Sequence, residues 1–196
     1  MGCRNEKDFC VPAGETFRPT LRWGSGVYTT KPITAITKAT PAVVTAVGHS
    51  LPNGWPCACV GVQGMTQINA TRYPPQGDDW SFGTVLSADT VAFNSVSSAN
   101  FSAYTSGGAL VYDTPAALTG MTITMTVYSD PDHETVLTTL SSVTPAQIAV
   151  DLTLTTITPT LQTAALTWDT GYYLVQATDS GGIITELLRG VINLET

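Results

Sequence analysis

Apolar and polar residues alternate strictly in the segment Met121–Tyr128. Every second residue is apolar, and the three residues between them are threonine. Because the side chains of a β-strand point alternately to opposite faces, this period of two predicts a half-buried strand. The residues that we expect to face a core are Met121, Ile123, Met125 and Val127.

The same period of two runs through Phe17–Trp23, where two arginines and a threonine alternate with apolar residues. Pro19 has no N–H group to donate, so we expect an edge strand or a strand interrupted by a bulge. Gly24-Ser-Gly26 then reads as a turn. The residues expected on the buried face are Phe17, Pro19, Leu21 and Trp23.

The rest of the C-terminal part also reads as strands. Residues 158–166 are the one place where a short helix or turn fits, and Asp179-Ser-Gly-Gly182 is typical of a hairpin turn. The sequence has no long helical period, which excludes parallel α/β folds and predicts an all-β protein. The further strands predicted here are Thr135–Leu140, Ile148–Ile157, Tyr172–Thr178 and Ile183–Leu194.

The segment between these two parts interrupts the pattern. The natural continuation of Phe17–Trp23 is the run from Leu118 to Tyr128, so an inserted module separates them. We therefore predict a discontinuous β-sandwich from residues 1–31 and 112–196, with a small β-barrel-like module, residues 32–111, inserted. Residues 1–12 are polar and lack periodicity, so we expect an arm. The strands predicted in the module are 33–38, 42–47, 57–62, 80–86 and 91–96, with turns at 48–54 and 73–79.

Charge narrows the classes of partner. Only 12% of the residues are charged, 43% are hydrophobic, and the net charge is −7. Nucleic-acid binding needs clustered Lys and Arg, so we expect no nucleic-acid partner. The sequence has no apolar run of the roughly 20 residues that a membrane span needs, and its N-terminus lacks the apolar core of a signal peptide. We expect synthesis in a cytoplasm and no membrane partner.

The residues most often used in catalysis do not form a recognisable set. His49 lies in Gly48-His49-Ser50, which we interpret as a turn because Gly, Ser, Pro and Asn surround it. His133 has no neighbouring nucleophile in a known motif. Asp78-Asp79 fits a solvated loop pair better than a calcium site, where acids normally alternate along the loop. We assign no catalytic, cofactor-binding or metal-binding residue, and we expect no cofactor and no enzymatic activity.

The cysteines form two close pairs, Cys3 with Cys10 and Cys57 with Cys59. Their spacings, six residues and one residue, do not fit the two to four residues between zinc ligands. Buried or free thiols are the favoured interpretation, and a structural disulfide or a metal site is the alternative. The four tryptophans are interpreted as core or interface anchors, with a carbohydrate-stacking platform as the alternative. They are Trp23, Trp55, Trp80 and Trp168.

Three collinear segments of residues 33–108 resemble a repeat of bacteriophage tail and fibre proteins. They are ITAITKATPAVVTAVGHSLPNG, GVQGMTQINATRY and ADTVAFNSVSSANFSAYTSGG. The repeat is described as similar to the first catalytic-cysteine half-domain of ubiquitin-activating enzymes. That half-domain is a β module without the enzyme's nucleophile, so the resemblance implies no ubiquitin chemistry. This sequence departs from the repeat at Ala70 and at Tyr73-Pro74-Pro75, where the repeat prefers glycine and a continuing strand.

The flanking segments are similar to the β-sandwich of phage baseplate and tail-fibre attachment proteins. The segments are Phe17–Trp23, LTGMTITMTVYSD and TAALTWDTGYYLVQATDSGGIITELLRGVINL. Together the two resemblances imply a non-enzymatic structural component of a tailed-phage virion, in the tail, baseplate or fibre-attachment region. The implied partners are other phage structural proteins and copies of the chain in a symmetric homo-oligomer. A capsid decoration or head-fibre protein, or a module that binds host-surface carbohydrate, is the alternative.

Overall fold

The alternating segment at residues 121–128 is a strand with the predicted faces. Strand β11 (Thr122–Tyr128) buries Ile123, Met125 and Val127 almost completely, whereas its threonines are only half-buried. The strand pairs on both sides, with β12 (Val136–Ser141) and β16 (Thr170–Thr178). The alternation of apolar residues alone therefore predicts which side chains of this strand face the core.

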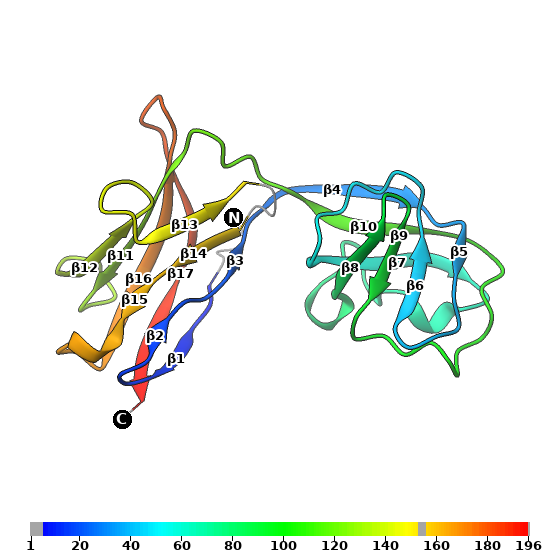
Figure 1. Cartoon of the computed structure of the whole chain (residues 1–196), viewed down its shortest axis with the longest axis horizontal. Helices are drawn as coiled ribbons and strands as arrows, with labels where there is room; N and C mark the ends of the chain where they lie inside the picture. The colour runs from blue at the N-terminus through cyan, green and yellow to red at the C-terminus, as the bar shows by residue number, and fades with distance from the viewer. Residues whose placement is uncertain (1–5, 153–155, 196) are drawn as a thin grey trace. The chain divides into compact units, whose positions relative to one another are not determined.

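The computed structural model describes residues 6–152 and 156–195. The chain divides into two compact units: unit 1 comprises Met1–Trp23 and Ala117–Thr196, and unit 2 comprises Gly24–Ala116 (Figure 1). The predicted all-β class is confirmed, and the helical pieces of the described residues are short 3-10 turns. None of these helices is long and apolar enough to span a membrane.

Unit 1 is built from two layers around one core. Its main sheet has five strands in the order β1-β17-β16-β11-β12, with β1 (Phe9–Pro12) parallel to β17 (Ile184–Glu195). The facing layer joins β13 (Ile148–Asp151), β14 (Thr156–Pro159) and β3 (Leu21–Arg22), with a short pair formed by β15 (Leu161–Gln162) and β2 (Thr16–Phe17). Ile123 and Tyr173 from the main sheet pack in one cluster with Leu21 and Ile157 from the facing layer. This arrangement is a β-sandwich.

The N-terminal segment is part of the sandwich, so the arm predicted for residues 1–12 is wrong over the described residues 6–12. Val11 is 5% exposed and belongs to the core. The Tyr173 hydroxyl donates a hydrogen bond to the carbonyl oxygen of Lys7. Gly190 permits this approach, because a Cβ there would lie 2.2 Å from the same oxygen. Long-range parallel pairing thus replaces the local periodicity that the segment lacks.

Three further segments of unit 1 were predicted from the sequence. The single strand predicted over Ile148–Ile157 is wrong, because β13 ends at Asp151 and β14 runs back antiparallel to it. The sequence between them has no Gly or Pro to mark the reversal. The single strand predicted over Phe17–Trp23 is divided around Pro19 into two short edge strands, β2 and β3, which pair with β15 and β14. The short helix or turn allowed at residues 158–166 contains the 3-10 turn η3 (Thr163–Ala165).

Unit 2 contains one seven-stranded sheet whose strands follow the order β4-β10-β7-β8-β9-β6-β5. Each strand is antiparallel to its neighbours, and a single apolar core lies against the sheet. The two end strands of this order do not pair, so the described residues form no closed barrel. The strands are β4 (Gly24–Pro32), β5 (Ala35–Ile36), β6 (Ala42–Thr45), β7 (Trp55–Gln63), β8 (Ser81–Ser87), β9 (Thr90–Phe93) and β10 (Ser106–Pro115).

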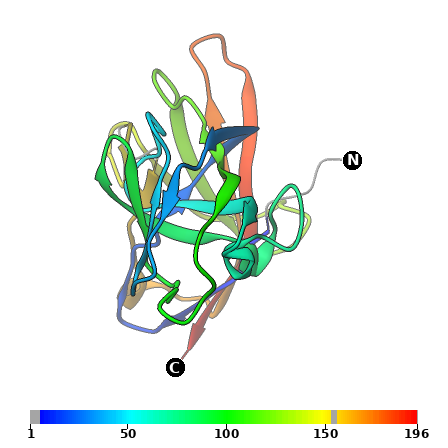
Figure 2. The same cartoon turned by 90° about the vertical axis from the view of Figure 1, so that its right-hand side faces the viewer.

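Two long strands of unit 2 were not predicted. The turn proposed at Gly24–Gly26 is the start of β4, and β10 pairs with β4 on one side and with β7 on the other (Figure 1; Figure 2). β4 is largely exposed and begins with glycines, so it shows no apolar alternation. The unit boundaries accordingly lie after Trp23 and after Ala116, rather than after residues 31 and 111.

The register of β11 is testable with one pair of substitutions. Ile123→Ala should lower the free energy of unfolding by about 2–5 kcal/mol, because it removes a buried side chain and leaves a cavity. Thr124→Ala, on the opposite face of the same strand, should cost less than about 1 kcal/mol. Denaturant unfolding of the full chain measures both. Equal losses would contradict the register, since a shift by one residue exchanges the two faces.

Candidate functional site

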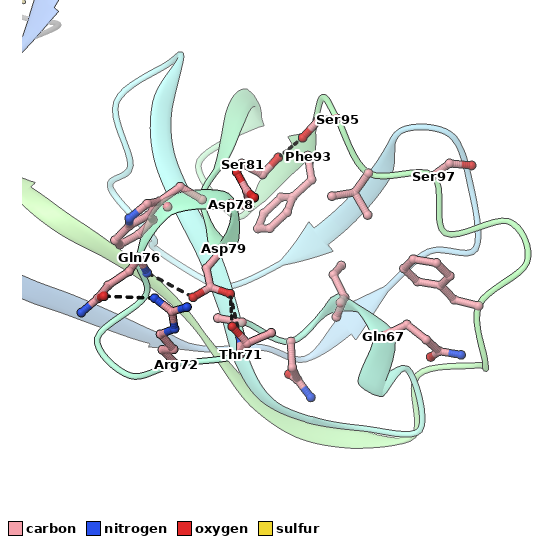
Figure 3. Close-up of a pocket in the computed structure, with 17 residues that line it drawn as sticks. Gln67, Thr71, Arg72, Gln76, Asp78, Asp79, Ser81, Phe93, Ser95 and Ser97 are labelled. Atoms are coloured by element: carbon pink, nitrogen blue, oxygen red, sulfur yellow. Dashed lines mark hydrogen bonds between the residues drawn. The ribbon is translucent and has the colours of Figure 1, made fainter. Parts of the chain in front are cut away.

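Unit 2 contains a hollow of about 660 Å³ beside the start of β8. Three stretches of chain line it, and they are residues 67–72, 76–81 and 93–101. They include the last two residues of the 3-10 turn η1 (Thr66–Ile68) and the whole of η2 (Gly77–Asp79). Figure 3 shows Arg72 and Gln76 at one end of the hollow and Gln67 and Ser97 at the other.

The hollow has an apolar floor and a polar rim. Phe93 and Ile68 are 2% and 9% exposed and belong to the core of unit 2, and the partly buried Val96 and Phe101 pack against that core. The rim carries exposed guanidinium, amide, carboxylate and hydroxyl groups that can meet a ligand. They belong to Gln67, Arg72, Gln76, Asp78, Ser95 and Ser97.

Asp79 fixes the loop that carries one half of this rim. Its Oδ1 accepts hydrogen bonds from the backbone N–H of Thr71 at 2.7 Å and from the Thr71 hydroxyl at 2.9 Å. Its Oδ2 accepts the backbone N–H of Gln76 at 3.1 Å. These donors, the Thr71 N–H first, hold the pKa of Asp79 below its ordinary value. Asp79 is therefore a charged brace, and of the predicted loop pair only Asp78 remains exposed at the rim.

Two further contacts shape the rim. Arg72 donates from Nη1 to Oε1 of Gln76 at 3.3 Å, which aligns the two long side chains (Figure 3). The hydroxyls of Ser81 and Ser95 lie 2.9 Å apart, which joins the start of β8 to the segment after β9. These hydrogen bonds already restrict the side chains, so less conformational entropy is lost when a ligand binds.

Aromatic side chains lie next to the hollow. The rings of Tyr28 and Trp80 stack with centroids 6.2 Å apart and planes 9° from parallel. Trp80 follows η2 directly, so the stack also fixes the end of the rim loop. Phe82, two residues further along an extended chain, is 52% exposed and points to the same face as Trp80. Tyr28 was not predicted here, because β4 was not predicted as a strand.

The other tryptophans serve the cores, so the four do not form one stacking platform. Trp55 is 2% exposed and donates its indole N–H to the carbonyl oxygen of Asp113 at 2.7 Å. Trp23 and Trp168 pack against the core of unit 1. The interpretation as core anchors is therefore confirmed for these three, and Trp80 is the one that lines the hollow.

Both histidines have structural contacts. The Nδ1 atom of the buried His49 accepts the N–H of Leu51 at 3.0 Å, so Nε2 carries the proton and donates to the carbonyl oxygen of Ser87 at 3.1 Å. The imidazole thus braces the loop in which it was predicted to lie. His133 lies against the ring of Tyr128, with centroids 4.7 Å apart.

The described cysteines Cys10, Cys57 and Cys59 are free thiols, and Cys3 lies outside the described residues. Cys57 and Cys59 are buried on the core face of β7, and burial raises the pKa of Cys57 to about 12 and also raises the pKa of Cys59. Both remain protonated at neutral pH and act as small apolar side chains. Within residues 6–152 and 156–195, no three His, Cys, Asp or Glu side chains gather in a way that could hold a metal ion.

Asp79 gives the rim a pH dependence whose sign follows from its lowered pKa. The bracing is complete above the ordinary pKa of an aspartate, about 4, and is lost as pH falls through the lowered folded-state value. Asp79→Asn should reproduce this loss at pH 7, with faster amide hydrogen exchange at Thr71 and Gln76. Asp78→Asn, at the adjacent exposed position, is the matched control. Unchanged exchange in Asp79→Asn would show that the carboxylate does not hold the loop.

The chain was compared with protein families and with curated proteins. No family model and no curated protein matches it.

Proposed function

We propose that this chain is a non-enzymatic structural component of a tailed-phage virion, in its tail, baseplate or fibre-attachment region. It assembles with other virion proteins and with copies of itself. The observation that carries the assembly role is an apolar hairpin tip in unit 1, where Ile183 and Ile184 are 67% and 62% exposed. This tip is the orange turn that joins β16 to β17 in Figure 1.

The tip is held in one conformation before any partner binds. The Asp179 carboxylate accepts the backbone N–H groups of Gly181 at 2.8 Å and of Ile183 at 2.9 Å. The backbone N–H of Asp179 donates to the carbonyl oxygen of Ile183 at 3.1 Å, which closes the turn. A rigid tip loses little conformational entropy on docking, so most of its apolar burial contributes to affinity.

The size of the apolar tip suits an assembly contact. Full burial of an isoleucine side chain contributes about 1.5–3 kcal/mol, so two neighbouring isoleucines form a small anchor. Such an anchor is weak alone and becomes strong when a symmetric particle repeats it. Val143 follows β12 at the end of the sheet where β11 begins opposite Thr178, and it is 53% exposed. It enlarges the apolar surface at this end of unit 1.

The chemistry of the described side chains supports a non-enzymatic role. The two histidines brace a loop and pack on a tyrosine ring, and Asp79 is occupied by backbone donors. A nucleophile and its general base would need to lie within hydrogen-bond reach of each other, with groups left to act on a substrate. The residues of the hollow are arranged for binding instead.

The assembly role predicts a selective loss of incorporation. The double substitution Ile183→Ser with Ile184→Ser, made in the phage gene, should lower the amount of this chain per purified particle at least tenfold. The fold should persist, because both side chains are exposed. Val136→Ser, at a 55% exposed position at the far end of β12, is the control and should leave incorporation unchanged. Quantitative mass spectrometry of purified particles measures the incorporation of the unaltered chain, the double variant and the control variant.

Two results would contradict the proposal. If the unaltered chain is missing from purified particles of the phage that encodes it, the virion role fails. If the double variant is incorporated as well as the unaltered chain, the tip is not the assembly contact and another exposed surface has to supply it. Circular dichroism and thermal unfolding of the purified variants separate a lost contact from a lost fold.

A further inference from the structure

We propose that the hollow of unit 2 is a binding site for a neutral glycan, whose sugar rings lie on the apolar floor while their hydroxyls meet the polar rim. The proposal concerns a different unit from the hairpin tip, and it holds or fails independently of the virion role. Its basis is the combination of an aromatic floor, a rim with both donors and acceptors, and a loop that is already braced.

The floor matches one side of a sugar. A pyranose ring presents a patch of C–H groups that packs on aromatic and aliphatic carbon. Phe101 and Val96 are partly buried residues of the lining, whereas Phe93 and Ile68 are buried. A volume of about 660 Å³ falls within the roughly 300–1,000 Å³ that small-molecule sites span. The hollow can therefore seat a short oligosaccharide segment.

The rim matches the other side of a sugar. Each hydroxyl of a sugar both donates and accepts hydrogen bonds, so it needs a mixture of groups around it. Arg72 supplies donors, Asp78 supplies acceptors, and the amides of Gln76 and Gln67 supply both. Arg72 and Gln76 lie at one end of the hollow, and Gln67 lies at the other end (Figure 3). One ligand lying along the floor therefore meets the groups at both ends.

The charge of the rim disfavours an anionic ligand. Arg72 is the one cationic residue in the lining, and Asp78 and Asp79 are the two anionic residues. A phosphate or another strongly anionic ligand would meet more negative than positive charge there, which disfavours its binding. A neutral sugar avoids that repulsion and still uses the charged groups as strong hydrogen-bond partners.

The hollow is also prepared for its ligand. The Asp79 carboxylate holds the turn that presents Arg72, Gln76 and Asp78, and the stacked rings of Tyr28 and Trp80 hold its far end. Binding sites gain affinity when the contacting groups need no ordering on binding. Asp79 and Trp80 are thus positioning residues, whereas Phe101 and Arg72 are expected to contact the ligand.

The test is a glycan array probed with the purified full-length chain, followed by NMR titration with the trisaccharides that score. We expect binding to neutral hexose or N-acetylhexosamine glycans, with amide shifts concentrated in residues 67–81 and 93–101. Arg72→Gln should weaken binding at least tenfold without affecting the fold, because Arg72 is exposed. Phe101→Ala should abolish binding. Leu86→Ala removes an exposed apolar side chain outside the lining and is the matched control.

The outcomes separate cleanly. No binding to any neutral glycan on the array overturns the proposal, and so does binding that produces no shifts in the residues of the hollow. Shifts in these residues with inorganic phosphate or an acidic peptide, and none with sugars, would identify an anion site instead and also overturn it. Phe101→Ala can disturb the core. If the Phe101→Ala variant fails to fold, the binding measured with Arg72→Gln tests the proposal. Binding that survives Arg72→Gln unchanged contradicts the assigned rim.

Discussion

The antiparallel pairing of β4 with β10 is the constraint on which the architecture depends. A module can be inserted into a sandwich only if its two ends lie together, and this pairing places Gly24 opposite Pro115. The contact leaves no room for a side chain, because a Cβ at Gly24 would lie 2.0 Å from Oδ2 of Asp113. The same carboxylate accepts the N–H of Gly26 at 2.9 Å. The pairing of β4 with β10 thus holds the first and last strands of unit 2 together.

The sequence predicts strands that bury one face and expose the other. It misses strands whose two faces are similarly exposed. β11 is buried on one face and half-exposed on the other, so its alternation is visible in the sequence. β4 is exposed along nearly its whole length, and its register depends on pairing with β10, a strand distant in sequence. β1 is only four residues long, and it is held by parallel pairing to β17 at the other end of the chain. Neither relation leaves a local period.

The candidate site was harder to predict than the fold because it is assembled from three separate stretches. The sequence singles out Asp78-Asp79 and Trp80 only as separate candidates. The role of Asp79 depends on the backbone N–H of Thr71, eight residues earlier. The one available signal was the position of Asp79 three residues after Gln76, which is typical of a capped turn. The floor could not be distinguished from ordinary core, since Phe93 and Ile68 also serve the core.

The acidic balance of the chain has a structural explanation that needs no basic partner. In an all-β protein, backbone N–H groups are satisfied by neighbouring strands, except in the loops, where side chains must accept them. Within the part of the chain that the structure describes, five aspartates accept loop or strand-end N–H groups in this way, and they are Asp79, Asp89, Asp113, Asp130 and Asp179. Such backbone donors hold the pKa values of Asp79 and Asp130 below the ordinary range. Acid therefore loosens loops such as the rim, whereas the backbone hydrogen bonds between strands do not titrate.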